Sequence, residues 1–361
     1  MNSLHFHEWS PFNNLSQRGQ RMSDFKQKPD SMKKKFSELI VFSAGGVAPP
    51  LTVLKRSFQA RTGIAVKMYN GRPEELTAMI QKGERCDLLS LGAGFIADAM
   101  VSNGLLKESS VNMECSVNSA LRQRKLIGWR DLALLTRRGS SFEGFDFSRL
   151  ISCLSSGSNP LPKLSLASAG CLTGIWEMAA LKHGPSSIDS IIAAKPAWAT
   201  SCGELISHLV TGRADAILGW NTFAGFRDPD MFMSILPEAI QFRRPTIICS
   251  PVTCANQEGA SAFVDHIFSE QGRIQYSQMG WTLPDWGVLA TFDSATSVMK
   301  GERLLTDAEL SVETIPTPRR FSSDCGSSIL IHNTSAARVL FHLSEMKGFA
   351  KCHPVEIASI F

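Results

Sequence analysis

The sequence predicts an α/β fold in which a parallel sheet is covered by helices on both faces. Three observations predict it. Short apolar runs alternate with amphipathic segments, glycine-containing turns separate many of them, and the same order occurs in both halves of the chain. Alternation at this short spacing is typical of parallel sheets. With 361 residues, the chain is long enough for two domains that each have their own core.

In the first half, strands and helices follow each other directly. Leu51, Leu54 and Phe58 recur at helical spacing and define the buried face of the first helix. Pro73 stands at a first-turn position of the second helix, and Gly83 ends it. The predicted strands cover residues 39–42, 64–69 and 87–91, and the predicted helices cover 51–60, 74–82 and 95–102.

The second half repeats this order. A strand over 132–136 is expected to leave the first lobe, and residues 154–163 are expected to form a loop. Further strands are predicted over 164–167, 214–220 and 247–249, and further helices over 175–183, 202–210 and 260–271. Beyond about residue 290 the periodicity is lost, so these residues are expected to be an appendage or partly disordered.

Composition excludes several classes of protein. The chain is 43% hydrophobic and 19% charged, which is ordinary for a soluble globular protein. A net charge of +4 is too small to indicate binding to nucleic acid or to a membrane surface. No apolar run approaches the roughly 18 residues of a membrane-spanning helix. The nine cysteines include no CxxC pair, so neither a disulfide framework nor a zinc site is predicted.

Residues 1–36 are predicted to be a flexible polar leader. They contain the basic run Lys33-Lys34-Lys35 and no apolar segment of the kind that a secretory signal needs. The chain as written therefore predicts no export signal and a cytoplasmic location. The cysteines agree, since most are expected to be buried in a reducing compartment.

The first strand and the turn after it form the most informative segment. Ser43, Gly45 and Gly46 lie between a buried strand and a helix, where backbone N–H groups and a hydroxyl suit an anion. Ser90 stands at the end of the third strand, where open α/β sheets present their ligands. Small residues in such a turn also serve packing alone, and that alternative stays open.

Signals for catalysis, metals and cofactors are weak. There is no GxSxG, HExxH or P-loop motif, and Gly92-Ala93-Gly94 lacks the third glycine of a dinucleotide fingerprint. Cys171, at a possible helix N-terminus, is a candidate for a lowered thiol pKa, but no base partner is identifiable. No enzyme, metal or cofactor is therefore predicted. The histidines and cysteines near the C-terminus match no ligand spacing: His332, His342, His353, Cys325 and Cys352.

The order of these pieces resembles type II periplasmic solute-binding proteins, and most closely their molybdate/tungstate-binding branch. The matching segments begin with Val41-Phe-Ser-Ala-Gly-Gly and Phe58-Gln-Ala-Arg-Thr-Gly-Ile-Ala-Val. The others run over Ile80-Gln-Lys-Gly-Glu-Arg-Cys-Asp-Leu-Leu-Ser, Gly170-Cys-Leu-Thr-Gly-Ile-Trp, Leu209-Val-Thr-Gly-Arg-Ala-Asp-Ala-Ile-Leu-Gly-Trp, and Phe263-Val-Asp-His-Ile-Phe-Ser-Glu-Gln-Gly-Arg.

The resemblance implies two Rossmann-like lobes joined by crossing strands, with a ligand in the cleft between them. Lobe 1 would comprise residues 37–128 and 246–290, lobe 2 residues 129–245, and residues 291–361 a C-terminal extension. In this family the lobes close over the ligand by a hinge motion.

The family's ligand positions fall on both lobes of this sequence. The first falls at the turn near Gly46, beside Ser43 and Gly45, and the second in Asn70-Gly71-Arg72-Pro73, where Arg72 is a candidate clamp for a carboxylate or an oxyanion. The remaining ones fall near Thr173, near Cys202, and at Trp220 followed by Asn221. The family holds a tetrahedral oxyanion with uncharged donors at helix N-termini.

The resemblance implies a solute-binding protein that captures a small molybdate- or tungstate-like oxyanion for an ABC-type permease, in the periplasm. One alternative is a cytoplasmic small-ligand sensor on the same fold, with the leader or the tail contacting a protein partner. A third is an enzyme built on this scaffold, in which Cys171 would be essential for turnover.

Overall fold

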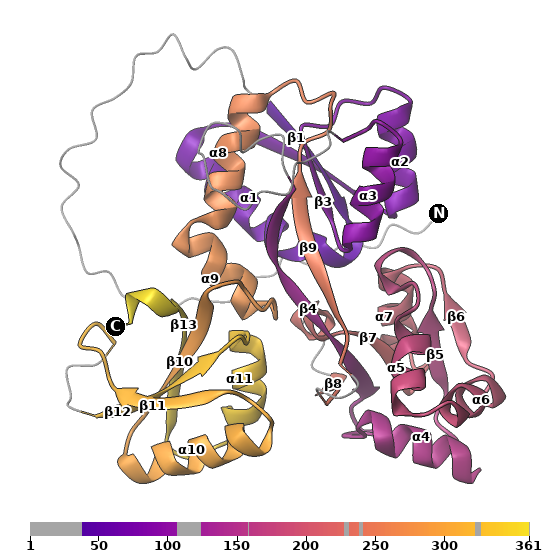
Figure 1. Ribbon diagram of the computed structural model, residues 1–361, viewed down its shortest axis with the longest axis vertical. Coiled ribbons are helices and arrows are strands. Elements are labelled where there is room, and N and C mark those ends of the chain that lie inside the picture. Colours follow the sequence, from indigo (N-terminus) through magenta and orange to yellow (C-terminus); the bar gives the residue numbers. More distant parts are fainter. Residues whose placement is uncertain are drawn as a thin grey trace. The chain divides into compact units, whose positions relative to one another are not determined.

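The computed structural model describes residues 38–106, 124–157, 159–226, 231–237, 241–321 and 326–360. The predicted leader lies outside these residues. The first lobe begins with β1 (Glu38–Ala44), the 3-10 turn η2 (Gly45–Val47) and α1 (Ala48–Thr62). It continues with β2 (Ala65–Gly71), α2 (Pro73–Gln81), β3 (Leu88–Leu91) and α3 (Gly94–Ser102). β1 pairs in parallel with β2 and β3, as the alternating pattern predicts (Figure 1).

Two long strands join this sheet to a second one. In β4 (Lys125–Arg137), residues 125–131 pair with β9 (Arg243–Cys249), and residues 132–136 pair with β7 (Ala216–Trp220). The strand order in the described residues is β2-β1-β3-β9-β4-β7-β5-β6, with β8 (Met231–Ile235) also on β4. The predicted α/β fold with two lobes and crossing strands is confirmed.

The second lobe is also built on a parallel arrangement. β5 (Leu164–Ala167) pairs in parallel with β6 (Ala197–Ala199) and β7. Around it lie η4 (Gly170–Leu172), α5 (Ile175–His183), α6 (Ser186–Ala193), α7 (Cys202–Val210) and η5 (Asn221–Phe226). The predicted loop over 154–163 is partly wrong, because its first residues belong to α4 (Phe147–Ser156). Asp146 caps that helix by accepting from the Arg149 N–H at 2.6 Å, and its apolar face is buried.

The helix predicted over 260–271 is in fact two helices, α8 (Gln257–Phe268) and α9 (Glu270–Gln278). Ser269, between them, has extended backbone, and its hydroxyl accepts from the Gly272 N–H. A serine side chain that caps the second helix separates the two. α8 packs against α1, on the first lobe (Figure 1).

The C-terminal residues form a folded layer of their own. Its elements are β10 (Trp286–Phe292), α10 (Ala295–Asp307), β11 (Val312–Pro316), β12 (Ser327–His332), α11 (Ala336–Leu343), β13 (Phe349–Glu356) and η7 (Ile357–Ser359). The sheet is antiparallel in the order β11-β12-β10-β13. Val288, Leu305, Ile329 and Val339 belong to the buried core of this layer. Figure 1 shows α10 and α11 beside the sheet. Partial disorder, one of the two expectations for this tail, is wrong for the described residues.

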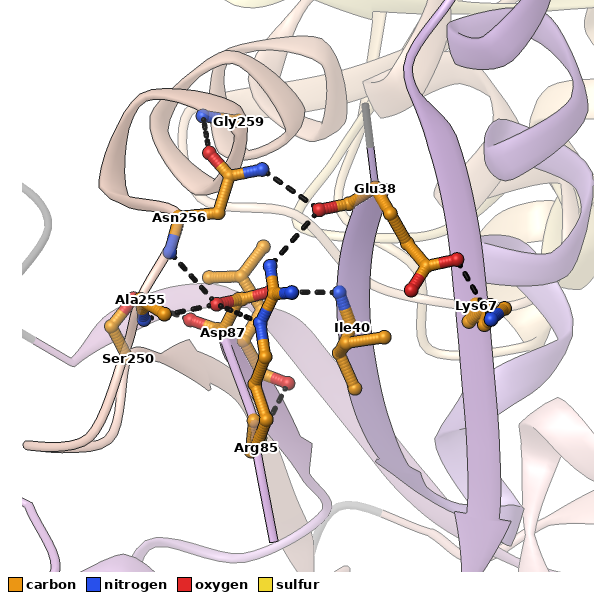
Figure 2. Close-up of polar contacts among 11 residues, drawn as sticks. Glu38, Ile40, Lys67, Arg85, Asp87, Ser250, Ala255, Asn256 and Gly259 are labelled. Atoms are coloured by element: carbon orange, nitrogen blue, oxygen red, sulfur yellow. Dashed lines mark hydrogen bonds and ion pairs between the residues drawn. The ribbon is translucent and has the colours of Figure 1, made fainter. Parts of the chain in front are cut away.

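One buried carboxylate fixes three elements of the first lobe. Asp87, directly before β3, is fully buried. Its oxygens accept hydrogen bonds from the backbone N–H groups of Ile40, Ala255 and Asn256 at 2.9–3.1 Å, and Arg85 binds it at 2.9 Å (Figure 2). The Asn256 side chain in turn caps α8 through the Gly259 N–H and donates to the Glu38 carbonyl. β1, β3 and the start of α8 are therefore held together by one charge.

Candidate functional site

A cavity of about 390 Å³ lies where the first-lobe strands end and where two second-lobe helical segments begin. The first lobe contributes residues 44–47 and 70–75, and the second lobe contributes 169–171 and 200–203. Neither η2 nor α1 has a side-chain cap at its N-terminus. η2 therefore presents first-turn N–H groups without a side-chain acceptor, which suits an anionic group, whereas α1 begins Ala48-Pro49-Pro50 and its prolines have no N–H to donate.

The backbone of the first lobe approaches side chains of β4 and of the second lobe very closely at and beside this cavity. A Cβ atom on Gly46 would lie 3.0 Å from the Cys202 Sγ, and a Cβ atom on Gly92 would lie 2.6 Å from Arg130 Nη2. Only glycine lets the first-lobe backbone approach these second-lobe and β4 side chains so closely. Gly45, by contrast, has no neighbour within 4 Å of such an atom, so its backbone faces open space.

Arg130, on β4, is fully buried and lies behind the cavity-lining residues Gly46 and Cys171 without lining the cavity itself. Its Nη2 donates to the Gly92 carbonyl, and its Nη1 lies 3.6 Å from the Cys171 Sγ. The guanidinium carbon is 4.7 Å from the centroid of the Trp220 ring. Its Nε has no hydrogen-bond partner, and within the described part of the chain no carboxylate forms an ion pair with it. Charges this deeply buried are normally paired.

Two thiols lie next to this arginine. The sulfur atoms of Cys171, in η4, and Cys202, at the start of α7, are 3.7 Å apart, and both residues line the cavity. The Trp220 Nε1–H donates to the Cys171 sulfur at 3.3 Å. The hydrogen bond from Cys202 and the charge of Arg130 hold the pKa of Cys171 well below its usual value, despite burial. The same contact and burial raise the pKa of Cys202.

Four of the predicted site residues line the cavity: Gly45, Gly46, Arg72 and Cys202. Arg72 is half-exposed and engaged with Glu75, whose Oε1 accepts from the arginine Nε at 2.8 Å and Nη2 at 2.6 Å. The same carboxylate accepts from the Arg72 backbone N–H and thereby caps α2. Its role as a clamp stays a prediction, and it requires this ion pair to open.

Ser43 and Ser90 lie beside each other on paired strands and are fully buried. The Ser43 hydroxyl donates to the Ala44 carbonyl at 3.2 Å. The Ser90 hydroxyl is buried without a partner in the described residues. Neither serine lines the cavity, because β1 and β3 are covered on both faces. Their roles as ligands also stay predictions.

The last three predicted residues lie around the cavity rather than on its wall. Trp220 is fully buried and reaches the site only through Cys171 and Arg130. The Asn221 side chain links the Asp131 N–H to the Gly280 carbonyl, so both ends of its amide are occupied. Thr173 is exposed, donates to the Gly170 carbonyl at 3.0 Å, and lines a neighbouring surface cavity.

The residue that sequence reasoning missed is Arg130. Its signal was available: Arg130 and Asp131 are the only charged residues within the run Leu126–Thr136, which is otherwise apolar apart from its ends. A charge in the middle of a buried strand needs a partner, and that need marks a candidate site. The described residues contain no cluster of three or more His, Cys, Asp or Glu side chains that could hold a metal ion. Nor does any described helix have the length and apolar character needed to cross a membrane.

Solved structures with the same fold are bacterial solute receptors. The periplasmic molybdate-binding protein of Azotobacter vinelandii matches with a TM-score of 0.56 and 16% identity over 68% of this chain and 99% of that chain. The sulfate-binding protein SubI of Mycobacterium tuberculosis matches with 0.54 and 14% over 69% and 88%. A substrate-binding protein of an ABC transporter from Agrobacterium tumefaciens matches with 0.54 and 14% over 68% and 78%. These likenesses confirm the type II fold.

Two family models match the chain in separate segments. Residues 287–351, within the C-terminal layer, match a model described as putative Se/S carrier protein-like. No curated protein matches the chain significantly. Residues 39–282, which include both lobes and the cavity, match the model of bacterial extracellular solute-binding proteins. The chain belongs to this solute-binding family.

Proposed function

We propose that the protein captures a small oxyanion of the molybdate or tungstate kind in the cavity between its lobes and delivers it to an ABC-type permease. The helix N-termini at the cavity supply N–H donors that favour negative charge. Relatives of the same fold are molybdate- and sulfate-binding proteins, and one serves an ABC transporter.

The observation that carries this proposal is the burial of Arg130 without a carboxylate partner among the described residues. A buried cation that lacks a carboxylate partner is unfavourable unless another group offsets its charge, and an anion held in the neighbouring cavity would do so. Since the medium around Arg130 is apolar, the attraction acts over a longer range than it would in water. Arg130 would therefore attract the solute without touching it.

Donors from both lobes line the cavity, so they meet the same solute only when the lobes are close together. Solute binding would then shift the population from open to closed. A permease that recognises the closed form would receive only the loaded protein. The periplasmic location belongs to this proposal. Its rival, a cytoplasmic sensor, predicts that the untagged protein fractionates with the cytosol.

The test is a thermal-shift screen of the full chain against molybdate, tungstate, sulfate, phosphate and small carboxylates. A solute at about 100 times its dissociation constant adds roughly 2.7 kcal/mol of stability, which raises the melting temperature measurably. A rise with the oxyanions and not with carboxylates supports the proposal. No rise with any anion, at either high or low concentration of reductant, overturns it.

A second candidate solute is an oxyanion of selenium or sulfur. Two observations favour it: thiols line the cavity, and the C-terminal layer matches a family described as Se/S carrier-like. Thiolates are soft ligands that prefer polarisable partners. Selenite and sulfite therefore belong in the same screen. A larger shift with selenite than with molybdate would favour this candidate.

A further inference from the structure

The cavity wall contains chemistry that anion capture does not use. Cys171 and Cys202, which both line the cavity, face each other with their sulfur atoms 3.7 Å apart. They come from η4 and from the first residue of α7, both in the second lobe, so neither hinge motion nor a distant segment is needed to bring them together. A disulfide needs an S–S distance of about 2.05 Å, so a closing movement of less than about 2 Å suffices.

Arg130 and Trp220 distinguish the two sulfurs. The arginine Nη1 and the indole N–H both point at Cys171, at 3.6 and 3.3 Å, whereas the contacts of the Cys202 sulfur in the described residues are Cys171 and the backbone N–H of Cys202 itself. A thiolate rather than a thiol is the nucleophile, and a neighbouring arginine favours the thiolate. Cys171 is therefore the reactive sulfur, and Cys202 is placed to attack whatever becomes attached to it.

We propose that Cys171 and Cys202 are a reactive thiol pair that exchanges with small disulfides through Cys171 and closes to an intramolecular disulfide, which makes anion capture redox-dependent. The Cys171 thiolate attacks one sulfur of a small disulfide R–S–S–R, the S–S bond breaks, and R–S⁻ leaves. The released R–S⁻ takes the proton of the Cys202 thiol. The Cys202 thiolate then attacks the Cys171 sulfur and releases the second R–S⁻. Two protein sulfurs are oxidised, and one small disulfide is reduced.

The effect on the solute follows from the position of Arg130. In the reduced state a thiolate on Cys171, 3.6 Å from the Arg130 Nη1, would offset part of the arginine charge and would place a negative charge on the cavity wall. That charge opposes an incoming anion. In the disulfide state neither sulfur carries charge, and the positive charge of Arg130 is available to the solute. The dependence of anion binding on the disulfide rests on the proposed function, whereas the thiol–disulfide exchange reaction does not.

The other cysteines of the described residues give the test its selectivity. Burial raises the pKa of Cys86, Cys249, Cys254 and Cys352, in Cys249 and Cys352 to about 12, so these thiols are protonated and slow to react at neutral pH. Cys153 is partly exposed on α4 and does not line the cavity. The variant Cys153→Ser is therefore the matched control.

The first measurement treats the reduced full chain with oxidised glutathione at pH 7 and maps disulfides by peptide mass spectrometry. We expect a Cys171–Cys202 disulfide in the wild type and in Cys153→Ser. In Cys202→Ser the mixed disulfide should accumulate on Cys171, and in Cys171→Ser the Cys202 thiol should stay unmodified. A mixed disulfide on Cys202 in Cys171→Ser, or no Cys171–Cys202 bond in the wild type, overturns the proposal.

The second measurement compares anion affinity, by titration calorimetry with molybdate and with selenite, in the oxidised and reduced protein. We expect affinity to be about fivefold to 150-fold higher in the oxidised protein, the usual range of coupling between sites. Cys171→Ser, which has no thiolate, should bind equally well in both conditions. Equal binding in both states of the wild type would refute the redox dependence. Disulfide formation with no anion binding in either state would refute the oxyanion function but leave the exchange reaction standing.

Discussion

Asp87 and Arg130 are both charged, both fully buried and both attached to the long sheet, yet their surroundings are opposite. Asp87 accepts three backbone hydrogen bonds and is paired with Arg85 (Figure 2). Arg130 has one carbonyl, a thiol and an aromatic ring, and its Nε has no partner in the described residues. The saturated charge holds elements together, whereas the unsaturated charge is available for binding. Buried charge is thus a marker of function only where its partners are incomplete.

The largest effect should come from removing the saturated charge. Asp87→Ala leaves three buried N–H groups without acceptors and should lower the free energy of unfolding by about 3–5 kcal/mol. Urea unfolding measures this loss. Arg85→Gln, which removes only the half-exposed partner, is the control and should cost about 1 kcal/mol or less. A loss below about 1 kcal/mol in Asp87→Ala would contradict the structural role.

His342, on α11 of the C-terminal layer, illustrates a third way to bury a titratable group. Burial, assisted by the charge of Arg338, lowers its pKa from 6.5 to about 4. Above pH 6.5 the imidazole is neutral in both the folded and the unfolded chain. Between pH 6.5 and about 4 only the unfolded chain takes up the proton, so stability should fall across this window and level off below it.

This prediction is checked by measuring unfolding midpoints from pH 7.5 to 3.5 in the wild type and in His342→Gln. The glutamine variant keeps a polar side chain but cannot titrate, so the difference between the two curves should shrink as the pH falls through the window. A constant difference over the whole range would show that His342 takes up its proton equally in both states. We expect a smaller effect than for Asp87→Ala, since His342 has no network to lose.

Arg130 should behave in the opposite way to Asp87. Arg130→Met removes a buried charge that lacks a carboxylate partner in the described residues and replaces it with an apolar side chain. Such replacements are often neutral or stabilising, so in the oxidised, solute-free protein, where Cys171 carries no charge, the free energy of unfolding should change by less than about 1 kcal/mol. Urea unfolding of the solute-free variant tests it. A loss of unfolding free energy comparable to that of Asp87→Ala would show that Arg130 is a structural residue like Asp87.

The smallest effect on stability is expected for Arg72. Its guanidinium is half-exposed and paired with Glu75, and exposed pairs of this kind contribute little to stability. Arg72→Ala should therefore leave the unfolding midpoint nearly unchanged, which differential scanning fluorimetry can verify. If the clamp role also holds, the same variant should weaken solute binding. Unchanged affinity would show that the ion pair with Glu75 stays closed in the loaded protein.

Much of the fold could be predicted because local signals and tertiary structure agree. One strand and two helices of the second lobe have the predicted bounds, because apolar periodicity and glycine or serine boundaries coincide there. They are the strand Leu164–Ala167 and the helices Ile175–His183 and Cys202–Val210. α6 was not predicted, and α8 and α9 were merged because a single capping serine, Ser269, decides where one helix ends and the next begins. The C-terminal layer was not predicted because its elements follow the order strand-helix-strand-strand-helix-strand in an antiparallel sheet, which breaks the strict alternation of the two lobes.

The site was harder to predict than the fold. Gly45, Gly46, Arg72 and Cys202 could be placed at one cavity because they stand at the ends of regular elements. The burial of Ser43 and Ser90 could not be predicted, because it depends on what covers each face of the sheet. Arg130 approaches Cys171 only through the pairing of β4 with strands of both lobes, and nothing local in the sequence encodes that proximity.

The central claim is that the incompletely paired charge of Arg130 attracts the solute. Titration calorimetry of oxidised wild type and oxidised Arg130→Met with molybdate tests it most directly, with Arg85→Gln as the matched control at the saturated charge. The account predicts that affinity falls by about tenfold or more in Arg130→Met, which corresponds to about 1.4 kcal/mol, and stays within about twofold of the wild type in Arg85→Gln. Equal affinity in the wild type and Arg130→Met would contradict the claim.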